Sequence, residues 1–298
     1  MKHESNEQIR YRAVRGMEGV EALEARRLRM TFDRHFHDTY AFGIVLAGVE
    51  RCRIGAHLNF FEPGIVPLFN PGDVHDGGPA APDGWSYRMV YLERRLVAGL
   101  LEDLGDDEPA FPAHSRSDEP ARRRVRAVFD AIDCGSALGL QESLRLVLET
   151  LFDGRASERT AARVMPRLER VRERLEAECC GALRLRDLCA EAGLSPSALL
   201  RSFEGAFGLS PHRYQQSRRT TRARRLIAAG MPLAAVATEC GYADQSHLNR
   251  WFLRVYGVTP GRFRTQLAES RARGAFEDHA ISSKTGQRSS LRIAGDTR

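Results

Sequence analysis

The chain has 298 residues, of which 42% are hydrophobic and 28% charged, with a formal net charge of +6 at pH 7. This ordinary composition excludes collagen-like, disordered and disulfide-scaffold proteins, and no run of about 18 apolar residues predicts a membrane-spanning helix. The polar first thirty residues lack the apolar stretch of a signal peptide. We therefore expect a cytoplasmic protein with two domains or one large one.

The charge is unevenly divided along the chain. Residues 1–159 carry 21 Lys and Arg against 26 Asp and Glu, a net −5, whereas residues 160–298 carry 24 against 13, a net +11. Such an asymmetry predicts an acidic module joined to a module that binds a polyanion. The six cysteines have no C-x-x-C spacing, which favours small buried residues over a zinc site or a disulfide framework.

The N-terminal part has the pattern of a β-rich domain with flanking helices. Residues 1–30 are expected to form a loose polar arm that leads into a strand. Between residues 28 and 93, short apolar runs alternate with Gly, Pro and Asp, which is typical of a small all-β barrel or sandwich. The clearest predicted strands are 40–46, 51–54, 65–69 and 85–92, and the predicted helices are 94–104, 119–132 and 139–152.

The helix predicted at 139–152 has one continuous apolar stripe. Its members lie at helical spacing and are Leu140, Leu144, Val147, Leu148 and Leu151. The stripe is consistent with two structures: a seam between the subunits of a homodimer, or a helix that packs on its own barrel. The sequence leaves both open.

Beyond this helix the composition changes twice. Residues 156–165 are small and polar and predict a linker, so the first domain covers 1–155. Helical periodicity then extends over 166–268, which predicts an all-α second domain. The final residues, 269–298, contain few large apolar side chains and are expected to form a disordered tail. The predicted fold class is therefore two-domain α+β.

An internal repeat divides the all-α domain into two similar halves. The segment Phe207-Gly-Leu-Ser-Pro-His-Arg-Tyr214 matches Tyr256-Gly-Val-Thr-Pro-Gly-Arg-Phe263 at an offset of 49. Each copy has a helix, a glycine-containing turn and a second helix, with Gly193 and Gly241 in the turns, where a positive φ is easy only for glycine. This is the layout of a helix-turn-helix unit, whose second helix enters the DNA major groove.

The helix between the two copies, at 212–229, is rich in arginine. A run of charge is usually a solvated surface, but its place between two DNA-reading units favours contacts with DNA phosphates. We predict such contacts for Arg218 and Arg222.

Bases are read by side chains in the first two turns of each recognition helix that point away from its Leu and Phe face. A histidine at such a position equally fits a solvent-facing role, so the prediction for His247 has this alternative. The predicted set is Ser197, Leu200 and Arg201 in the first copy and Gln245, Ser246, His247, Asn249 and Arg250 in the second.

The stretch Gly241-Tyr-Ala-Asp-Gln-Ser-His-Leu-Asn-Arg-Trp-Phe252, continuing to Gly257-Val-Thr-Pro260, resembles the signature of AraC/XylS-type transcriptional regulators. The DNA-binding domain of that family has two helix-turn-helix units joined by a long helix, and the resemblance covers about 166–268. It implies binding to double-stranded promoter DNA, a homodimer, contact with RNA polymerase, and activation rather than repression.

Two histidine motifs in the β-rich region, His35-Phe-His37 and Pro71-Gly-Asp-Val-His75, resemble those of the cupin barrel, the sensor module of many AraC-type regulators. Metal-binding cupins use these histidines together with a glutamate. Here no Glu follows His37 within four positions, and Glu50 is too far along the chain. The resemblance therefore implies neither catalysis nor a metal or other cofactor, and a metal held by the three histidines is the alternative.

The strand at 85–92 alternates in a way that places its aromatic side chains on one face. An aromatic face inside a small barrel can stack on a ligand, although it is more often core. We predict that a small-molecule effector contacts His35, His37, His75, Trp85 and Tyr87.

Together these features predict a transcriptional regulator that binds DNA and responds to a small molecule, and that is not an enzyme. Two alternatives remain at this point: a metal-dependent cupin enzyme with an accessory DNA-binding module, and a DNA-binding architectural protein without a ligand.

Overall fold

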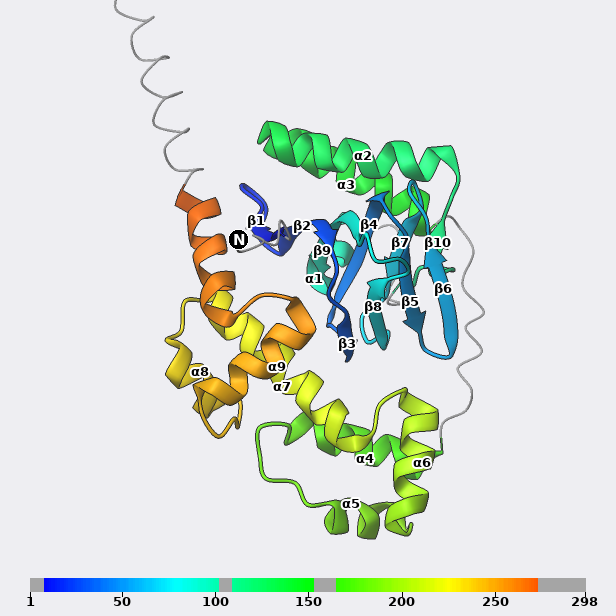
Figure 1. Cartoon of the computed structure of the whole chain (residues 1–298), viewed down its shortest axis with the longest axis vertical. Coiled ribbons are helices and arrows are strands. Elements are labelled where there is room, and N and C mark those ends of the chain that lie inside the picture. Colours follow the sequence, from blue (N-terminus) through cyan, green and yellow to red (C-terminus); the bar gives the residue numbers. More distant parts are fainter. Residues whose placement is uncertain (1–7, 102–108, 153–164, 273–298) are drawn as a thin grey trace, which may run out of the picture.

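The computed structural model describes residues 8–101, 109–152 and 165–272 (Figure 1). The predicted linker lies outside these residues except for Met165, as does the predicted tail from 273 onward. Within the described ranges no helix is long and apolar enough to cross a membrane.

The N-terminal domain consists of two antiparallel sheets, which confirms the predicted β-rich fold. The six-stranded sheet has the order β1 (Gln8–Ala13), β2 (Val20–Leu28), β9 (Trp85–Glu93), β4 (Thr39–Ala47), β7 (Val66–Phe69) and β10 (Ser115–Arg116). The four-stranded sheet has the order β3 (Phe32–His35), β8 (His75–Pro79), β5 (Glu50–Ile54) and β6 (His57–Phe61). Side chains from both sheets share one core between them.

The first strands correct the expectation of a loose arm. β1 pairs with β2 in continuous register from Gln8 opposite Arg26 to Ala13 opposite Glu21. Ile9 and Tyr11 are buried, and each is followed by an arginine, Arg10 and Arg12. Polar or charged residues occupy every second position, so the segment has the average composition of a solvent-exposed arm. The alternation of these residues with apolar ones is nevertheless that of a strand.

Three helices cover the outer face of the six-stranded sheet, namely α1 (Arg94–Leu100), α2 (Glu119–Cys134) and α3 (Ala137–Phe152) (Figure 1). The apolar stripe of α3 is buried in the core that these helices form with the sheet, and Leu144 and Leu148 have no exposed surface. The stripe is therefore not a dimer seam. It packs on its own domain, as the second of the two interpretations expected.

The C-terminal domain is all-α and contains the two predicted helix-turn-helix units. Its helices are α4 (Pro166–Ala177), α5 (Leu185–Ala192), α6 (Pro196–Phe207), α7 (Pro211–Ala228), α8 (Leu233–Glu239), α9 (Gln245–Tyr256) and a last helix over 260–272. Residues 269–272, which the sequence assigned to the tail, belong to that last helix. α7 connects the two units (Figure 1).

Local sequence explains how each unit turns. Ser195 and Asp244 cap the recognition helices α6 and α9 by accepting hydrogen bonds from the backbone N–H of Ala198 and His247. Gly241 has φ +72°, and a Cβ there would lie 2.1 Å from the carbonyl oxygen of Cys180. Only glycine fits that turn.

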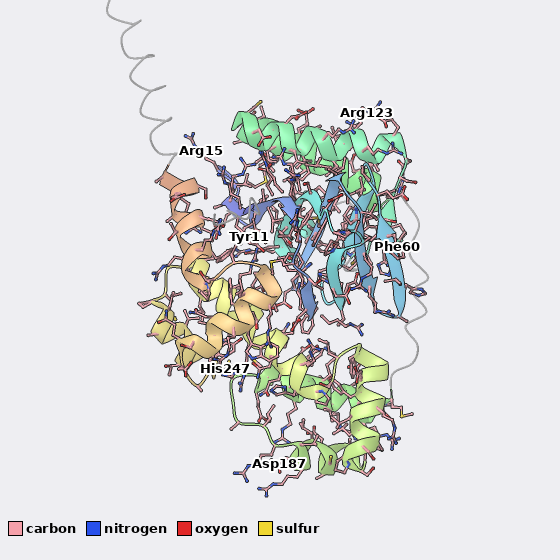
Figure 2. The ribbon with its side chains drawn as sticks, in the orientation of Figure 1. Tyr11, Arg15, Phe60, Arg123, Asp187 and His247 are labelled. Atoms are coloured by element: carbon pink, nitrogen blue, oxygen red, sulfur yellow. The ribbon has the colours of Figure 1, made fainter. Side chains whose placement is uncertain are left out.

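The two domains are in direct contact through both units. Phe36 and Val74 of the barrel share a core with α4, α5 and α6. The core between the sheets continues into the second unit, where Val255 and Tyr256 of α9 join it, and α9 lies against β3. In Figure 2, Tyr11 lies at this contact, and its hydroxyl donates to the carbonyl of Tyr256 at 3.0 Å.

Candidate nucleic-acid interface and effector cavity

The N-terminal ends of both recognition helices are exposed. On α6, Ser197, Leu200 and Arg201 are exposed, and on α9 so are Gln245, Ser246 and Arg250. Neither Arg201 nor Arg250 has a hydrogen-bond or ion-pair partner among the described residues, so both guanidinium groups are available to a ligand with planar acceptors. The predicted base-reading role of these residues stays a prediction.

Two residues of the predicted base-reading set on α9, His247 and Asn249, are less accessible to DNA. The indole N–H of Trp251 donates to Nε2 of His247 at 3.0 Å, so His247 already uses one ring nitrogen within its own helix. Asn249 is half-buried, and its side-chain oxygen is buried without a hydrogen-bond partner. In Figure 2, His247 lies on the side of α9 away from the strands.

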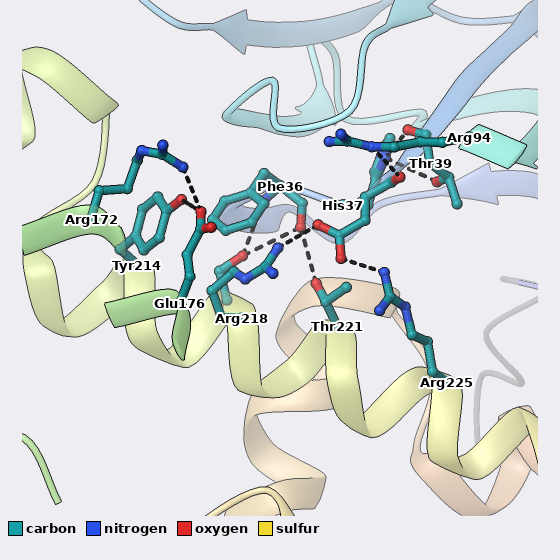
Figure 3. A network of polar contacts seen from close by, with 12 residues as sticks. Phe36, His37, Thr39, Arg94, Arg172, Glu176, Tyr214, Arg218, Thr221 and Arg225 are labelled. Atoms are coloured by element: carbon teal, nitrogen blue, oxygen red, sulfur yellow. Dashed lines mark hydrogen bonds and ion pairs between the residues drawn. The ribbon is translucent and has the colours of Figure 1, made fainter. Parts of the chain in front are cut away.

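Four of the arginines of α7 face the barrel, which changes the interpretation of this helix. Arg218 and Arg225 both donate to the carboxylate of Asp38 at 2.5 Å, while Thr221 donates to the carbonyl of Phe36 at 3.4 Å (Figure 3). Two more arginines of α7 pair with acidic residues of the barrel. Arg213, near the start of the helix, pairs with Asp33 at 3.1 Å, and Arg224, near its end, pairs with Glu21 at 2.7 Å. In this arrangement Arg218 connects the two domains through its pair with Asp38.

Arg222, the other predicted phosphate contact, has its ion-pair partner in the helical domain and not in the barrel. It forms an exposed ion pair with Glu239 of α8 at 2.6 Å. Its neighbour Arg219 belongs to the same arginine-rich stretch that favoured phosphate contacts in the sequence, and its guanidinium donates to the carbonyl groups of Cys179, Gly181 and Gly241. Arg219 thus fixes the loop before α5 to the turn of the second unit.

Three histidines lie together inside the barrel, as the motifs predicted. The ring centroids of His35 and His37 are 4.5 Å and 5.1 Å from that of His75. Each Nδ1 lies 2.7 to 2.8 Å from a backbone carbonyl two residues away. Because a carbonyl only accepts, each Nδ1 carries the proton, and each Nε2 is left as an acceptor with no partner among the described residues.

Burial keeps these rings neutral. Burial, and secondarily the neighbouring histidine ring, lowers the pKa of His35, His37 and His75 to about 3. The cavity beside them therefore offers three uncharged acceptors. Within the described ranges, no group of three or more His, Cys, Asp or Glu side chains is arranged to hold a metal ion.

The two aromatic residues predicted to contact a ligand, Tyr87 and Trp85, differ in whether they line the cavity. Tyr87 lines the cavity with the three histidines. Trp85 does not, because it is 1% exposed and stacks on Tyr87 with ring centroids 5.7 Å apart, with Phe32 at its edge. The structure therefore places Trp85 in the core beside the cavity, and a ligand contact for this residue stays a prediction.

Glu50 lines the same cavity, although its position in the sequence suggested that it was too distant. β5 lies beside β8, so Glu50 is opposite Pro79, four residues after His75. Burial, and secondarily the charge of Asp76, raises the pKa of Glu50 to about 8. At neutral pH its carboxyl group is protonated and can donate a hydrogen bond.

The DNA-binding domain supplies one wall of this cavity. Arg224 of α7 and Val255 and Tyr256 of α9 line it together with the barrel residues. The cavity has a volume of about 50 Å³, and a much larger cleft of about 2070 Å³ separates other parts of the two domains. No pattern within either domain's own sequence indicated this shared wall, since Arg224 and Glu21 are 203 residues apart.

Comparison with protein families gives two matches. Residues 19–148 match the family described as AraC-like ligand binding domain, and residues 188–266 match the family described as helix-turn-helix domain. The first range covers the barrel without β1, together with most of α1 to α3, and the second covers both helix-turn-helix units from within α5 onward.

Curated relatives align over both domains. The transcriptional regulator YbfI of Bacillus subtilis is 26% identical over 236 residues, covering 77% of this chain and 86% of the relative. The arabinose operon regulatory protein of Escherichia coli is 28% identical over 221 residues, covering 70% of this chain and 74% of the relative. The transcriptional activator RhaS of Escherichia fergusonii is 26% identical over 261 residues, covering 82% of this chain and 91% of the relative.

Among solved structures, the crystal structure of ToxT from Vibrio cholerae O395 superposes with a TM-score of 0.52 at 13% identity, covering 84% of this chain and 99% of that chain. At this identity the likeness concerns the fold alone. It extends over both domains.

Proposed function

The chain belongs to the AraC family of DNA-binding transcriptional regulators, a family of non-enzymes with an N-terminal ligand-binding domain, and on this premise we propose that it activates transcription in response to a small hydroxyl-rich effector bound in the barrel. The family membership sets aside the cupin-enzyme alternative. The observation that carries the proposal is the cavity of three neutral histidines, whose Nε2 atoms are left without partners.

The DNA-binding part of the proposal is supported by the two recognition helices. Their exposed N-terminal turns present Arg201 and Arg250, each able to form a bidentate pair with guanine O6 and N7. Two such helices on one domain address successive turns of the major groove, about 34 Å apart. We therefore expect an operator with two unequal half-sites one helical turn apart.

The effector class follows from the hydrogen-bond groups in the cavity. Three imidazole acceptors are best matched by a molecule with several hydroxyl donors, and the protonated carboxyl of Glu50 adds a donor. The positive charge of Arg224 is balanced by Glu21, so a neutral occupant leaves no unpaired buried charge. One relative is named for an arabinose operon, and a sugar has the expected chemistry.

Activation, contact with RNA polymerase and dimerisation are part of the same proposal. Activation is supported by the name of RhaS as a transcriptional activator. Since the stripe of α3 is buried, a homodimer would use a different surface.

The test selects binding sites from random double-stranded DNA with the full-length protein, with and without a panel of aldoses and polyols. We expect one enriched operator with paired half-sites, and at least one panel member that raises the thermal midpoint of unfolding and changes operator affinity. Enrichment of no sequence would contradict the DNA-binding role. A well-defined operator with no response to any panel member would contradict the effector class.

A further inference from the structure

The boundary between the small cavity and the large interdomain cleft is formed by four residues that line both. They are His37, Tyr91, Arg224 and Tyr256. Two of them belong to the barrel and two to the DNA-binding domain. A molecule that enters the cavity from the cleft therefore has to pass between side chains of the two domains.

Arg224 is held at this boundary by several contacts. Its guanidinium pairs with Glu21 at 2.7 Å and lies 5.3 to 5.9 Å from the ring centroids of Tyr11, Tyr91, Tyr256 and Phe263. Its side chain is 12% exposed, yet its Nε–H is buried without a hydrogen-bond partner. A buried donor without a partner is unfavourable, so Arg224 has one group that an occupant could satisfy.

The size of the cavity limits what it can hold while the domains are docked. Its volume of about 50 Å³ leaves room for a few water-sized groups. Binding sites for small molecules are usually larger, roughly 300–1,000 Å³. The wall that can move without unfolding the barrel is the one made by Arg224, Val255 and Tyr256, because it belongs to another domain.

We propose that Arg224 and Tyr256 form a gate between the cleft and the cavity, and that an effector of sugar size binds only when the DNA-binding domain moves away from the barrel. This inference rests on the proposed function and adds the regulation of the same site. The docked arrangement is then the effector-free state. Effector binding weakens docking, and by linkage any change that weakens docking strengthens effector binding.

The gate can be tested without knowing the effector, because diethyl pyrocarbonate acylates neutral histidine at a free ring nitrogen. The probe is applied to the full-length protein, and modification is followed by peptide mass spectrometry. His57, on the exposed strand β6, is the internal reference. With the gate closed, His35, His37 and His75 should react about tenfold more slowly than His57, since reaction requires local opening.

Two variants open the gate in different ways. Arg224→Gln removes the gate side chain, and Glu21→Gln removes its anchor, which lines the cleft but not the cavity. Each should raise modification of the three histidines at least threefold without changing the rate at His57. The control is Arg222→Gln on the same helix, whose side chain pairs with Glu239 and lines neither space.

Unfolding is recognised independently by circular dichroism, and Glu21→Gln keeps the test valid if Arg224→Gln does not fold. The gate is contradicted if the cavity histidines of the native protein react as fast as His57, or if the control variant raises their rates as much as the gate variants do. Failure of the proposed function would show instead as absence of a selected operator, with the modification rates unaffected.

Discussion

Asp38 accepts a hydrogen bond from Arg218 at 2.5 Å across the contact between the barrel and the DNA-binding domain. The carboxylate is 14% exposed and also accepts from Arg225. These arginines lie on the helix that joins the two recognition units (Figure 3). The positive charge of that helix favoured a phosphate-binding role in the sequence. In the structure, four of its arginines form ion pairs with acidic residues of the barrel.

Replacing Asp38 with asparagine should loosen this contact. The variant leaves two guanidinium groups without a charged partner, so we expect the free energy of unfolding to fall by about 1–2 kcal/mol. Urea denaturation of the full chain measures it. The matched control is Glu239→Gln, whose partner Arg222 is 47% exposed, and such an exposed pair contributes less than about 0.5 kcal/mol. Equal losses in the two variants would mean that Asp38 does not stabilise docking.

The stripe of α3 gives a second prediction. Leu144→Ala removes a fully buried side chain from the core of the first domain, and we expect a loss of about 2–5 kcal/mol in the free energy of unfolding. Leu138→Ala on the same helix is the control, because Leu138 is 78% exposed and should change stability by less than about 0.5 kcal/mol. A stable, folded Leu144→Asp protein that sediments as a smaller species would instead restore the dimer seam.

The sequence predicted the elements whose signals are local. The turn glycine Gly241 and the Leu and Phe face of α9 were both predicted because the residues that define them are neighbours in the chain. β1 was missed because its alternate residues Gln8, Arg10 and Arg12 are polar or charged, although Ile9 and Tyr11 alternate correctly. Its burial depends on β2 and on the last helix, where Gln266 accepts from the backbone N–H of Tyr11.

The effector cavity was only partly predictable for the same reason. β3 ends at His35 and His37 follows two residues later, so their pairing was a local signal in the sequence, and His75 was linked to them by motif. Glu50 and Arg224 carry no such signal, since strand pairing places Glu50 there and domain docking places Arg224. The sequence also could not separate Tyr87 from Trp85, which lie on the same face but at different depths.

The pH dependence of stability should reveal the buried carboxyl group. Glu50 has a pKa of about 8 in the folded protein, against 4.5 as its ordinary value. Its contribution to stability is therefore fully present below pH 4.5 and is lost as pH rises through 8, with a slope of at most about 1.4 kcal/mol per pH unit. The cavity histidines act in the opposite direction and on the acid side, since their contribution is lost as pH falls from 6.5 through 3.

Glu50→Gln isolates the carboxyl group between pH 6.5 and 8, because the titration of the histidines is common to the variant and the native chain and cancels in the difference between them. We expect the difference in unfolding free energy between the variant and the native chain to grow in favour of the variant over this interval. Glu62→Gln, at an exposed position nearby, should show no such trend. Parallel pH profiles for the native protein and Glu50→Gln would contradict a protonated Glu50.

The contributions of the two recognition helices to operator recognition can be measured separately by replacing Arg201 or Arg250. Arg201→Ala should relax base preference in one half of the operator, and Arg250→Ala in the other, each at a cost of about 1–3 kcal/mol for the preferred base. The reason is that a bidentate pair discriminates guanine, whereas a phosphate contact is the same at every sequence. The measurement is a fluorescence-anisotropy titration of each variant against operators substituted one base pair at a time. Arg123→Ala, on the exposed side of α2 and far from both helices (Figure 2), should leave every affinity unchanged. A uniform weakening across all operators, with a smaller salt dependence, would reassign the arginine in question to the phosphate backbone.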